Sequence, residues 1–283
     1  MRIVYLFIKM AEHVYEIVSN RSFLIKDDSD SRECDIRGVC LLGSGQLVIV
    51  DYNNRKVKLL NAEMQLTSTS TFKNHPHDVC MIANDTIAVT VAEWDNPGEI
   101  HLFKVTGDSF QALKVLPLDH YCNGISSING QLIVRSNTAL LLYSTEGELI
   151  KQLFVEENAT EYGHTTEYSI DSSSDGQYIY MADFPNDQIL TLDKDGNLLA
   201  TYQDEKALEY IAGVCSAECG AVFVSETGAH SIMQIKKDGT QRLASLAKNN
   251  HGVYIPRALH FDNKTKRLFV GQLDDDILVL HLK

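Results

Sequence analysis

Two short groups of histidine and cysteine residues could, by type and spacing, bind a transition metal. His75 and His77 flank Pro76, and Cys215 and Cys219 lie four positions apart. A structural zinc site needs four such ligands, usually supplied as two closely spaced pairs. Neither group has a second pair nearby in the sequence, so we assign no metal site to either.

The sequence motifs of common hydrolases and nucleotide-dependent enzymes are missing. There is no Gly-x-Ser-x-Gly segment, which places a catalytic serine at a sharp strand-to-helix turn. There is also no glycine-rich loop that ends in Lys-Ser or Lys-Thr, the arrangement that holds nucleotide phosphates. We therefore assign no catalytic residue and no cofactor, and we favour a function in binding.

The net charge limits the choice of partner. The 283 residues include 25 Lys plus Arg and 38 Asp plus Glu, which gives a formal net charge of −13. A chain with this charge repels nucleic acid and anionic membranes and attracts basic partners. Short basic clusters at positions 55–58, 236–237 and 264–267 lie far apart in the sequence, and we interpret them as solvated surface charge.

The first residues and the six cysteines bear on the cellular compartment. Residues 3–8 are six consecutive apolar residues, whereas a secretory signal has an apolar stretch of roughly 7–15 residues. We therefore expect residues 1–11 to be a leader that is disordered or loosely docked. Without a clear signal, we expect reduced thiols and a cytoplasmic location.

A sequence repeat runs through almost the whole chain and sets the positions of the residues named above. In Ser169–Gly196, short β-rich runs alternate with the turn sequences Ser-Ser-Asp-Gly, Phe-Pro-Asn-Asp and Lys-Asp-Gly. Asp-Gly after such a run indicates a hairpin, because glycine adopts positive φ without steric cost. Equivalent positions in the six repeats are Cys40, Cys80, Ser126, Ile170, Cys215 and Leu259. The intervals between them are 40, 46, 44, 45 and 44 residues.

A period of about 45 residues with four short strands is typical of a β-propeller blade. Each small sheet can bury its two faces only against its neighbours. The sequence therefore predicts an all-β, six-bladed propeller with four antiparallel strands per blade, as one domain over residues 12–283. The last repeat has only three strands, and we expect Glu12–Asp27 to add the fourth, which would remove an exposed sheet edge.

The fourth repeat resembles the NHL repeat. Gly176–Asp183 reads Gly-Gln-Tyr-Ile-Tyr-Met-Ala-Asp and is followed by Ile189 and Asp-Lys-Asp-Gly, with weaker copies in Gly45–Leu60 and Ala221–Gly239. The chain is similar to invertebrate, including molluscan, NHL propellers and to the C-terminal propellers of tripartite-motif proteins. This resemblance implies a six-bladed fold and a binding function.

The chain also departs from this pattern. The third and sixth repeats have Arg135-Ser136 and Gly271-Gln272 where the fourth has Asp183. No RING or B-box array of cysteines and histidines is present, so we do not expect this chain alone to be a ubiquitin ligase. RNA-binding relatives have a basic top face, and the acidic composition of this chain argues against one.

The loops that join the second and third strands share one face of a propeller, the top face. In this chain they carry ten acids and one arginine, Arg55. The acids are Asp51, Glu93, Asp95, Glu99, Asp183, Asp187, Glu226, Asp274, Asp275 and Asp276. We expect an acidic face that docks a basic protein or peptide; the alternative is a solvated loop surface. The single tryptophan, Trp94, and His230 lie in the same loops, and Trp94 is either an interface anchor or packed between blades.

The residues just before each first strand are expected around the mouth of the central channel. They include Arg37, His77, Asp78, Asn123, Glu167, Tyr210 and Arg257. Such converging polar groups could bind a ligand or simply line a water-filled channel. Six-bladed calcium-dependent lactonases and esterases bind Ca²⁺ through Glu, Asn and Asp, which Glu167, Asn123 and Asp78 could supply. Two arginines at the same place would oppose a cation.

The sequence thus predicts a monomeric, non-catalytic protein-interaction propeller with a basic protein or peptide as its partner. Two alternatives stay open: an RNA-binding propeller of the tripartite-motif type, and a calcium-dependent lactonase-like or esterase-like enzyme.

Overall fold

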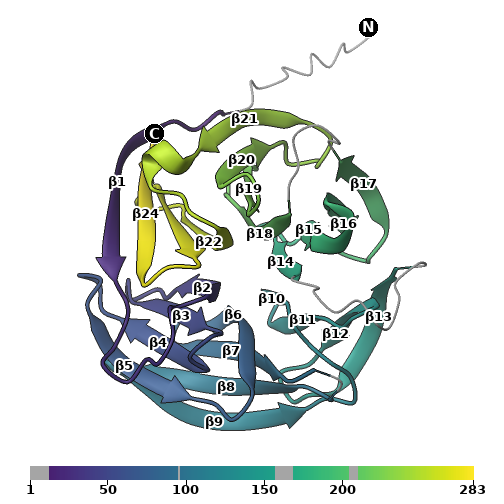
Figure 1. Ribbon diagram of the computed structural model, residues 1–283. Coiled ribbons are helices and arrows are strands. Elements are labelled where there is room, and N and C mark those ends of the chain that lie inside the picture. Colours follow the sequence, from purple (N-terminus) through teal and green to yellow (C-terminus); the bar gives the residue numbers. More distant parts are fainter. Residues whose placement is uncertain (1–12, 95, 157–167, 204–209) are drawn as a thin grey trace, which may run out of the picture.

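Six antiparallel sheets of four strands each surround a central axis in the computed structural model (Figure 1). The structure describes residues 13–94, 96–156, 168–203 and 210–283. The predicted six-bladed, all-β propeller is confirmed. The leader predicted for residues 1–11 lies outside the described residues. Within the described part of the chain, no helix is long and apolar enough to cross a membrane.

Each blade begins next to the axis and proceeds outward. The inner strands are β2 (Ile36–Leu41), β6 (His75–Ala83), β10 (Ile125–Ile128), β14 (Tyr168–Ser172), β18 (Ile211–Ser216) and β22 (Pro256–Asp262). The second strands are β3 (Leu47–Asp51), β7 (Thr86–Ala92), β11 (Gln131–Arg135), β15 (Tyr178–Asp183), β19 (Val222–Glu226) and β23 (Arg267–Gln272). All six positions that define the sequence repeat fall in the inner strands.

The outer half of each blade completes the sheet. The third strands are β4 (Lys56–Leu60), β8 (Glu99–Thr106), β12 (Ala139–Tyr143), β16 (Gln188–Asp193), β20 (Ser231–Ile235) and β24 (Asp276–Leu282). The outer strands are β5 (Leu66–Thr71), β9 (Ser109–Pro117), β13 (Leu149–Val155), β17 (Leu198–Gln203), β21 (Arg242–Ala247) and β1 (Ile17–Leu24). Two short 3-10 helices are η1 (Phe184–Asn186) and η2 (Asn249–His251).

The hydrophobic core is divided among the blade interfaces. Six clusters of buried side chains are present, and each joins two neighbouring blades. One of them packs Val48 and Val57 of the first blade against Val79 and Val89 of the second. All residues of β3 and β4 are buried, whereas β5 alternates between partly buried and exposed residues. The middle strands of this blade are therefore buried on both faces, whereas its outer strand shows the alternation of a half-exposed strand.

The ring is closed by pairing the first described strand with the last. β1 runs antiparallel to β24, from Ile17 opposite Leu282 to Leu24 opposite Asp276, and this confirms the expected closure. Just before β1, the Tyr15 ring contacts Phe223 of the fifth blade and Phe261 of the sixth. The N-terminal segment therefore fastens two blades as well as supplying a strand.

Two glycines show how the turns are fixed. Asn129 and Gly130 have φ values of 51° and 75°, which is typical of a two-residue type I′ hairpin. Gly196, with φ of 92°, also lies against the third blade, and a β-carbon there would be 2.0 Å from the carbonyl oxygen of Leu153. A β-carbon at Gly130 would meet no atom within 4 Å.

We expect Gly196→Ala to lower the free energy of unfolding by more than Gly130→Ala does. Both changes place a β-carbon on a residue with positive φ, which costs about 1–2 kcal/mol. Only Gly196→Ala also forces the backbones of two blades apart. Urea unfolding of the two variants measures the difference. Equal decreases in the free energy of unfolding would show that the blade contact at Gly196 does not contribute to stability.

Candidate functional site

The second strand ends in a buried polar residue in five of the six blades. These residues are Asp51, Arg135, Asp183, Glu226 and Gln272, each at most 1% exposed. Four of these side chains bond to the hairpin that follows, and Gln272 instead accepts a hydrogen bond from the Tyr254 amide at 2.8 Å. Asp183, for example, accepts hydrogen bonds from Asn186 at 2.8 Å and Gln188 at 2.6 Å.

Three acids expected on the docking surface are among these buried residues. Asp51 accepts a hydrogen bond from Asn54 at 2.8 Å, and Glu226 accepts one from Ser231 and pairs with Arg242 at 3.4 Å. The expectation that Asp51, Asp183 and Glu226 project into solvent is therefore wrong. A carboxylate at this position satisfies donors of the following loop, which its residue type alone does not reveal.

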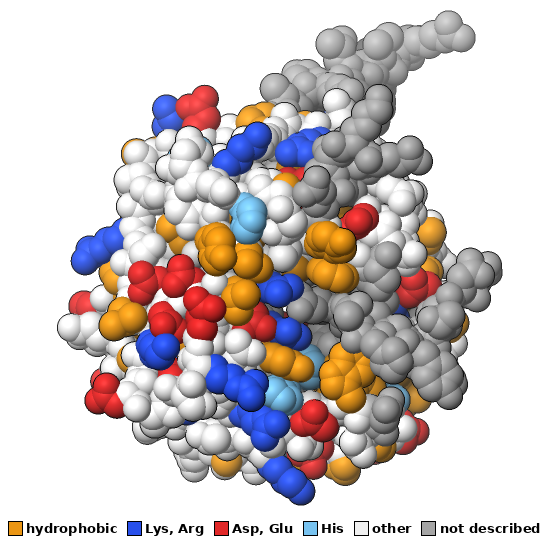
Figure 2. All heavy atoms as spheres, in the orientation of Figure 1, with side chains coloured by type: hydrophobic (Ala, Val, Ile, Leu, Met, Phe, Trp, Pro, Cys, Tyr) orange, Lys and Arg blue, Asp and Glu red, His pale blue; other side chains and the backbone are white. Residues whose placement is uncertain are grey.

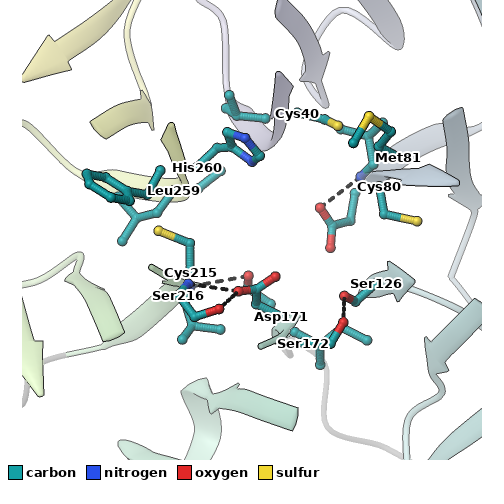
Figure 3. A pocket seen from close by; sticks show the side chains of 18 of the residues that line it. Cys40, Cys80, Met81, Ser126, Asp171, Ser172, Cys215, Ser216, Leu259 and His260 are labelled. Atoms are coloured by element: carbon teal, nitrogen blue, oxygen red, sulfur yellow. Dashed lines mark hydrogen bonds between the residues drawn. The ribbon is translucent and has the colours of Figure 1, made fainter. Parts of the chain in front are cut away.

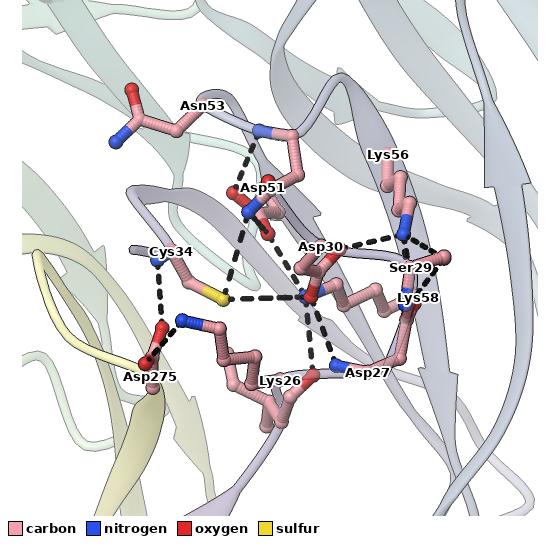
Figure 4. Close-up of polar contacts among 12 residues, drawn as sticks. Lys26, Asp27, Ser29, Asp30, Cys34, Asp51, Asn53, Lys56, Lys58 and Asp275 are labelled. Atoms are coloured by element: carbon pink, nitrogen blue, oxygen red, sulfur yellow. Dashed lines mark hydrogen bonds and ion pairs between the residues drawn. The ribbon is translucent and has the colours of Figure 1, made fainter. Parts of the chain in front are cut away.

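Asp51 also belongs to a buried charge cluster around Lys58 (Figure 4). The Lys58 Nζ atom lies 2.6 Å from Asp30 Oδ2, 2.9 Å from Asp51 Oδ2 and 3.3 Å from Cys34 Sγ. Burial alone would lower the pKa of Lys58, but the charge of Asp51 and the hydrogen bond to Asp30 outweigh it and raise the pKa. Lys58 is therefore a charged group in the protein interior.

The same cluster contains the one potential metal-ligand group found among the described residues. Ligand atoms of Asp30, Cys34 and Asp51 lie within 4.8 Å of one another. The Lys58 ammonium contacts all three, so it provides the positive charge that a metal would otherwise supply. We interpret this group as structural.

The neighbouring Lys56 makes a second set of ion pairs. Its Nζ atom lies 2.9 Å from Asp27 Oδ2 and 2.6 Å from Asp30 Oδ1. Lys56 and Lys58 are 5% and 0% exposed, so the interpretation of the cluster at positions 55–58 as solvated charge is wrong for these two residues. Together they hold the segment that leads from the closing strand β1 to the inner strand β2.

The structure brings two predicted mouth residues, Arg37 and Arg257, together around Asp35. Arg37 Nη2 lies 2.9 Å from Asp35 Oδ2, and Arg257 Nε lies 3.6 Å from Asp35 Oδ1. The Arg37 guanidinium also lies over the ring of Tyr52, 3.5 Å from its centroid. This described part of the mouth therefore places two cations around one anion, in contrast to the net charge of the chain.

The predicted calcium ligands do not assemble among the described residues. Glu167 lies outside them. The Asn123 side-chain oxygen accepts a hydrogen bond from the Gly124 amide at 2.7 Å, and Asp78 lies in the wall of the channel rather than at the mouth. His77 is buried; burial and then the charge of Arg37 lower its pKa to about 3, so its imidazole is neutral.

Four ring pairs surround the mouth. In each pair, one ring comes from a loop between second and third strands, and the other comes from the segment entering the next blade. The pairs, with their centroid distances, are Tyr52–His75 (4.2 Å), Trp94–Tyr121 (5.8 Å), Phe184–Tyr210 (5.4 Å) and His230–Tyr254 (5.2 Å). All four are stacked, with interplanar angles between 10° and 29°.

These pairs leave aromatic surface exposed. Trp94, Tyr210 and Tyr254 are 37%, 57% and 50% exposed. Figure 2 shows hydrophobic side chains grouped around the centre of the face, with basic and histidine side chains between them. Trp94 is therefore both packed between blades and exposed.

The sequence signal for the pairs is an aromatic residue or histidine in the top loop and another near the start of the next blade.

Several of the remaining predicted acids pair with neighbouring groups. Acidic side chains gather to one side of the face in Figure 2. Asp274 and Asp275 are partly buried, and Asp275 pairs with Lys26 at 2.8 Å. Asp187 accepts a hydrogen bond from the Tyr210 amide at 2.8 Å. Asp95 lies outside the described residues.

Arg55, the basic residue expected in these loops, is exposed at the edge of the first ring pair. Its Nε atom lies 3.3 Å from His75 Nε2, and its Nη1 donates to the Lys73 carbonyl oxygen at 3.1 Å. Arg55 therefore positions the His75 ring that stacks on Tyr52.

We expect Lys58→Met to lower the free energy of unfolding by about 3–5 kcal/mol, because it leaves buried carboxylates without their cation. The control is Lys104→Met. Lys104 is 45% exposed and pairs with Asp85 at 3.3 Å on the surface, so its removal should change stability little. Urea unfolding measures both, and similar small losses would contradict the assigned role of Lys58.

The Lys56 ion pairs should make stability depend on acid pH. Burial would raise the pKa of Asp27, but hydrogen bonds from Ser29 and Lys56 lower it from 3.8 to about 2. The unfolded chain therefore binds this proton first, and the stabilisation present above pH 3.8 is lost as the pH falls toward about 2. As the pH falls over this range, the urea concentration at the unfolding midpoint should decrease less steeply for Lys56→Met than for the unmodified protein. Parallel curves would contradict a contribution of the Lys56–Asp27 pair to this pH dependence.

Comparisons with known proteins extend the description of the fold. No protein family model and no curated protein sequence matches the chain. A Bacteroides thetaiotaomicron protein of unknown function is 12% identical, with a TM-score of 0.71 over 94% of this chain and 76% of that one. Virginiamycin B lyase from Staphylococcus aureus is 11% identical, with a TM-score of 0.62 over 95% of this chain and 100% of that one.

A third solved structure is the PQQ-bound aldose sugar dehydrogenase from Streptomyces coelicolor. It is 11% identical, with a TM-score of 0.65 over 94% of this chain and 99% of that one. At these identities the likeness concerns the fold alone, and one β-propeller fold hosts unrelated functions. The chain is therefore a six-bladed β-propeller whose structural neighbours include enzymes and a protein of unknown function.

Proposed function

We propose that this protein is a non-catalytic recognition module that binds a partner protein or peptide on its top face. The observation that carries the proposal is the set of exposed rings of Trp94, Tyr210 and Tyr254 around a mouth that contains Arg37 and Arg257. Tryptophan, tyrosine and arginine are the residues enriched at the energetic centres of protein interfaces.

The face is organised before a partner arrives. Each exposed ring stacks on a second ring, and Arg37 is held by Asp35 and the Tyr52 ring. The loops that carry Tyr52, Phe184 and His230 are held by the buried acids Asp51, Asp183 and Glu226 at the ends of the preceding strands. A partner would therefore bind without the cost of ordering these side chains, which favours affinity.

The charge distribution supports a peptide-like partner with basic groups. Partly exposed acids such as Asp187, Asp274 and Glu93 lie in the top-face loops and would attract basic side chains during approach. Arg37 and Arg257 would instead interact with acceptors such as backbone carbonyl oxygens. The resemblance of Gly176–Gly196 to the NHL repeat favours the same kind of function, since propellers of that type serve as binding modules.

The test is a selection of peptides from a random display library on the immobilised full chain. Because Trp94 is the only tryptophan, its fluorescence reports binding near the mouth. We expect Tyr210→Ala and Tyr254→Ala each to weaken selected peptides at least tenfold, or about 1.4 kcal/mol. The control variants are Leu198→Ala and Leu199→Ala on β17, which are 49% and 53% exposed but lie away from the top face.

Three results would overturn the proposal. Peptides that bind the tyrosine and leucine variants equally would show that the top face is not the docking surface. Binding of RNA instead of peptide, with an affinity that falls steeply with salt, would favour the RNA-binding alternative. A thermal stabilisation by CaCl₂ that chelation reverses would favour the calcium-dependent enzyme.

A further inference from the structure

A second potential site lies on the axis, inside the ring. It is a cavity of about 300 Å³, and all six inner strands contribute to its wall, which places it at the lower end of the size range of ligand pockets. Figure 3 shows its polar side chains pointing toward one another from different blades. The wall includes Asp78, Asp171, His260, Ser126, Ser172 and Ser216.

This cavity is separate from the mouth on the top face. Its described lining includes Ser174 and Asn263, which lie in the turns that follow the inner strands β14 and β22. These turns are at the face opposite the top loops, so the cavity reaches that face. Arg37 and Arg257 are not among its described lining residues.

Each of the two carboxyl groups is fixed in place by neutral donors. The Asp78 oxygens accept hydrogen bonds from the amides of Val79 at 2.8 Å and Ile125 at 3.0 Å. Asp171 Oδ2 accepts bonds from the amide and the hydroxyl of Ser216, at 2.8 and 2.6 Å. The lining that the structure describes contains no lysine and no arginine. No lysine or arginine of this lining therefore balances the charge of these two groups when they are ionised.

The other titratable groups of the wall do not supply that charge. Burial lowers the pKa of His260 to about 4, so the imidazole is neutral near pH 7. Burial also raises the pKa values of the Cys40, Cys80 and Cys215 thiols, which keeps them protonated. Among the described lining groups, only the two aspartates can become charged as the pH rises through about 6 and toward about 8.

The buried environment shifts the pKa values of the two aspartates. Burial raises the pKa of Asp78 to about 8, with a further contribution from the charge of Asp171. Burial likewise raises the pKa of Asp171 to about 6. A cation in the cavity would favour the ionised form of both groups. Perturbed carboxyl groups in a concave site are typical of functional positions.

The geometry disfavours a metal ion as this cation. Calcium takes about 6–8 oxygen ligands packed around one point. Among the described residues, no three carboxylate, imidazole or thiol ligand atoms of the cavity lie within 4.8 Å of one another, since the group that meets this condition is the Lys58 cluster. A larger cation with directed donors fits better. An ammonium group has three N–H donors, and carboxylate and serine oxygens are suitable acceptors.

We infer that the axial cavity binds a small organic amine in its protonated form, with Asp78 and Asp171 as the charged anchors and the serine hydroxyls as additional acceptors. This binding site is independent of the top face. The amine enters from the face opposite the top loops.

The test uses butane-1,4-diamine and butylamine on the full chain, with butane-1,4-diol as the neutral probe and CaCl₂ as the metal probe, all at constant ionic strength. We expect the amines, but neither the diol nor calcium, to raise the melting temperature and to give saturable heats in calorimetry. Asp171→Asn should weaken amine binding at least tenfold. Asp78→Asn tests the second anchor if the first variant does not fold.

The matched control is Asp175→Asn. Asp175 lies in the turn after β14, the strand that carries Asp171, and its carboxylate pairs with Lys237 on the surface. This variant should leave amine binding unchanged. Affinity of the unmodified protein should rise as the pH increases through about 6 and toward about 8, the pKa values of Asp171 and Asp78, with release of protons on binding.

Several outcomes would overturn the inference. These are no stabilisation by either amine, equal binding of the diol, tighter binding of calcium than of amines, and unchanged amine affinity in both aspartate variants. A loss of amine binding in Asp175→Asn as large as in Asp171→Asn would also overturn it. Loss of top-face peptide binding would not affect it.

Discussion

A four-stranded blade cannot bury both of its faces alone, and every other feature of this structure depends on six blades closing into a ring. The six hydrophobic clusters lie between blades, so each exists only when both neighbours are present. The last contacts are made by the segment around β1. Tyr15 packs across two blades, and Lys56 and Lys58 hold the connection into β2 through buried ion pairs.

Ring closure also creates the two candidate sites. It brings loops of different blades into contact at the top face, where rings from successive blades stack in pairs. On the axis, it places Asp78 and Asp171 in one cavity although they come from the second and fourth blades. Neither arrangement exists within one blade. Both sites are therefore formed only in the closed ring.

The fold could be predicted from the sequence because strands and turns recur locally, and even the closing strand followed from counting them. The sites could be predicted only in part. Lys58 pairs with Asp51 and with Asp30, which lies 28 positions away in sequence, so residue type alone suggested solvent exposure for these charged residues. The stacked rings likewise belong to different repeats. Asp171 lies in a serine-rich strand without any motif, and only the shared cavity distinguishes it.

The pairing of Ile17 with Leu282 has a consequence for biosynthesis. Contacts between residues so distant in sequence give the closing step a high contact order, which slows folding. Blades can form in sequence as the chain leaves the ribosome, but the last interface waits for β24. Until then, the apolar faces that the first and last blades bury against each other stay uncovered, and exposed apolar surface of this kind is prone to aggregation.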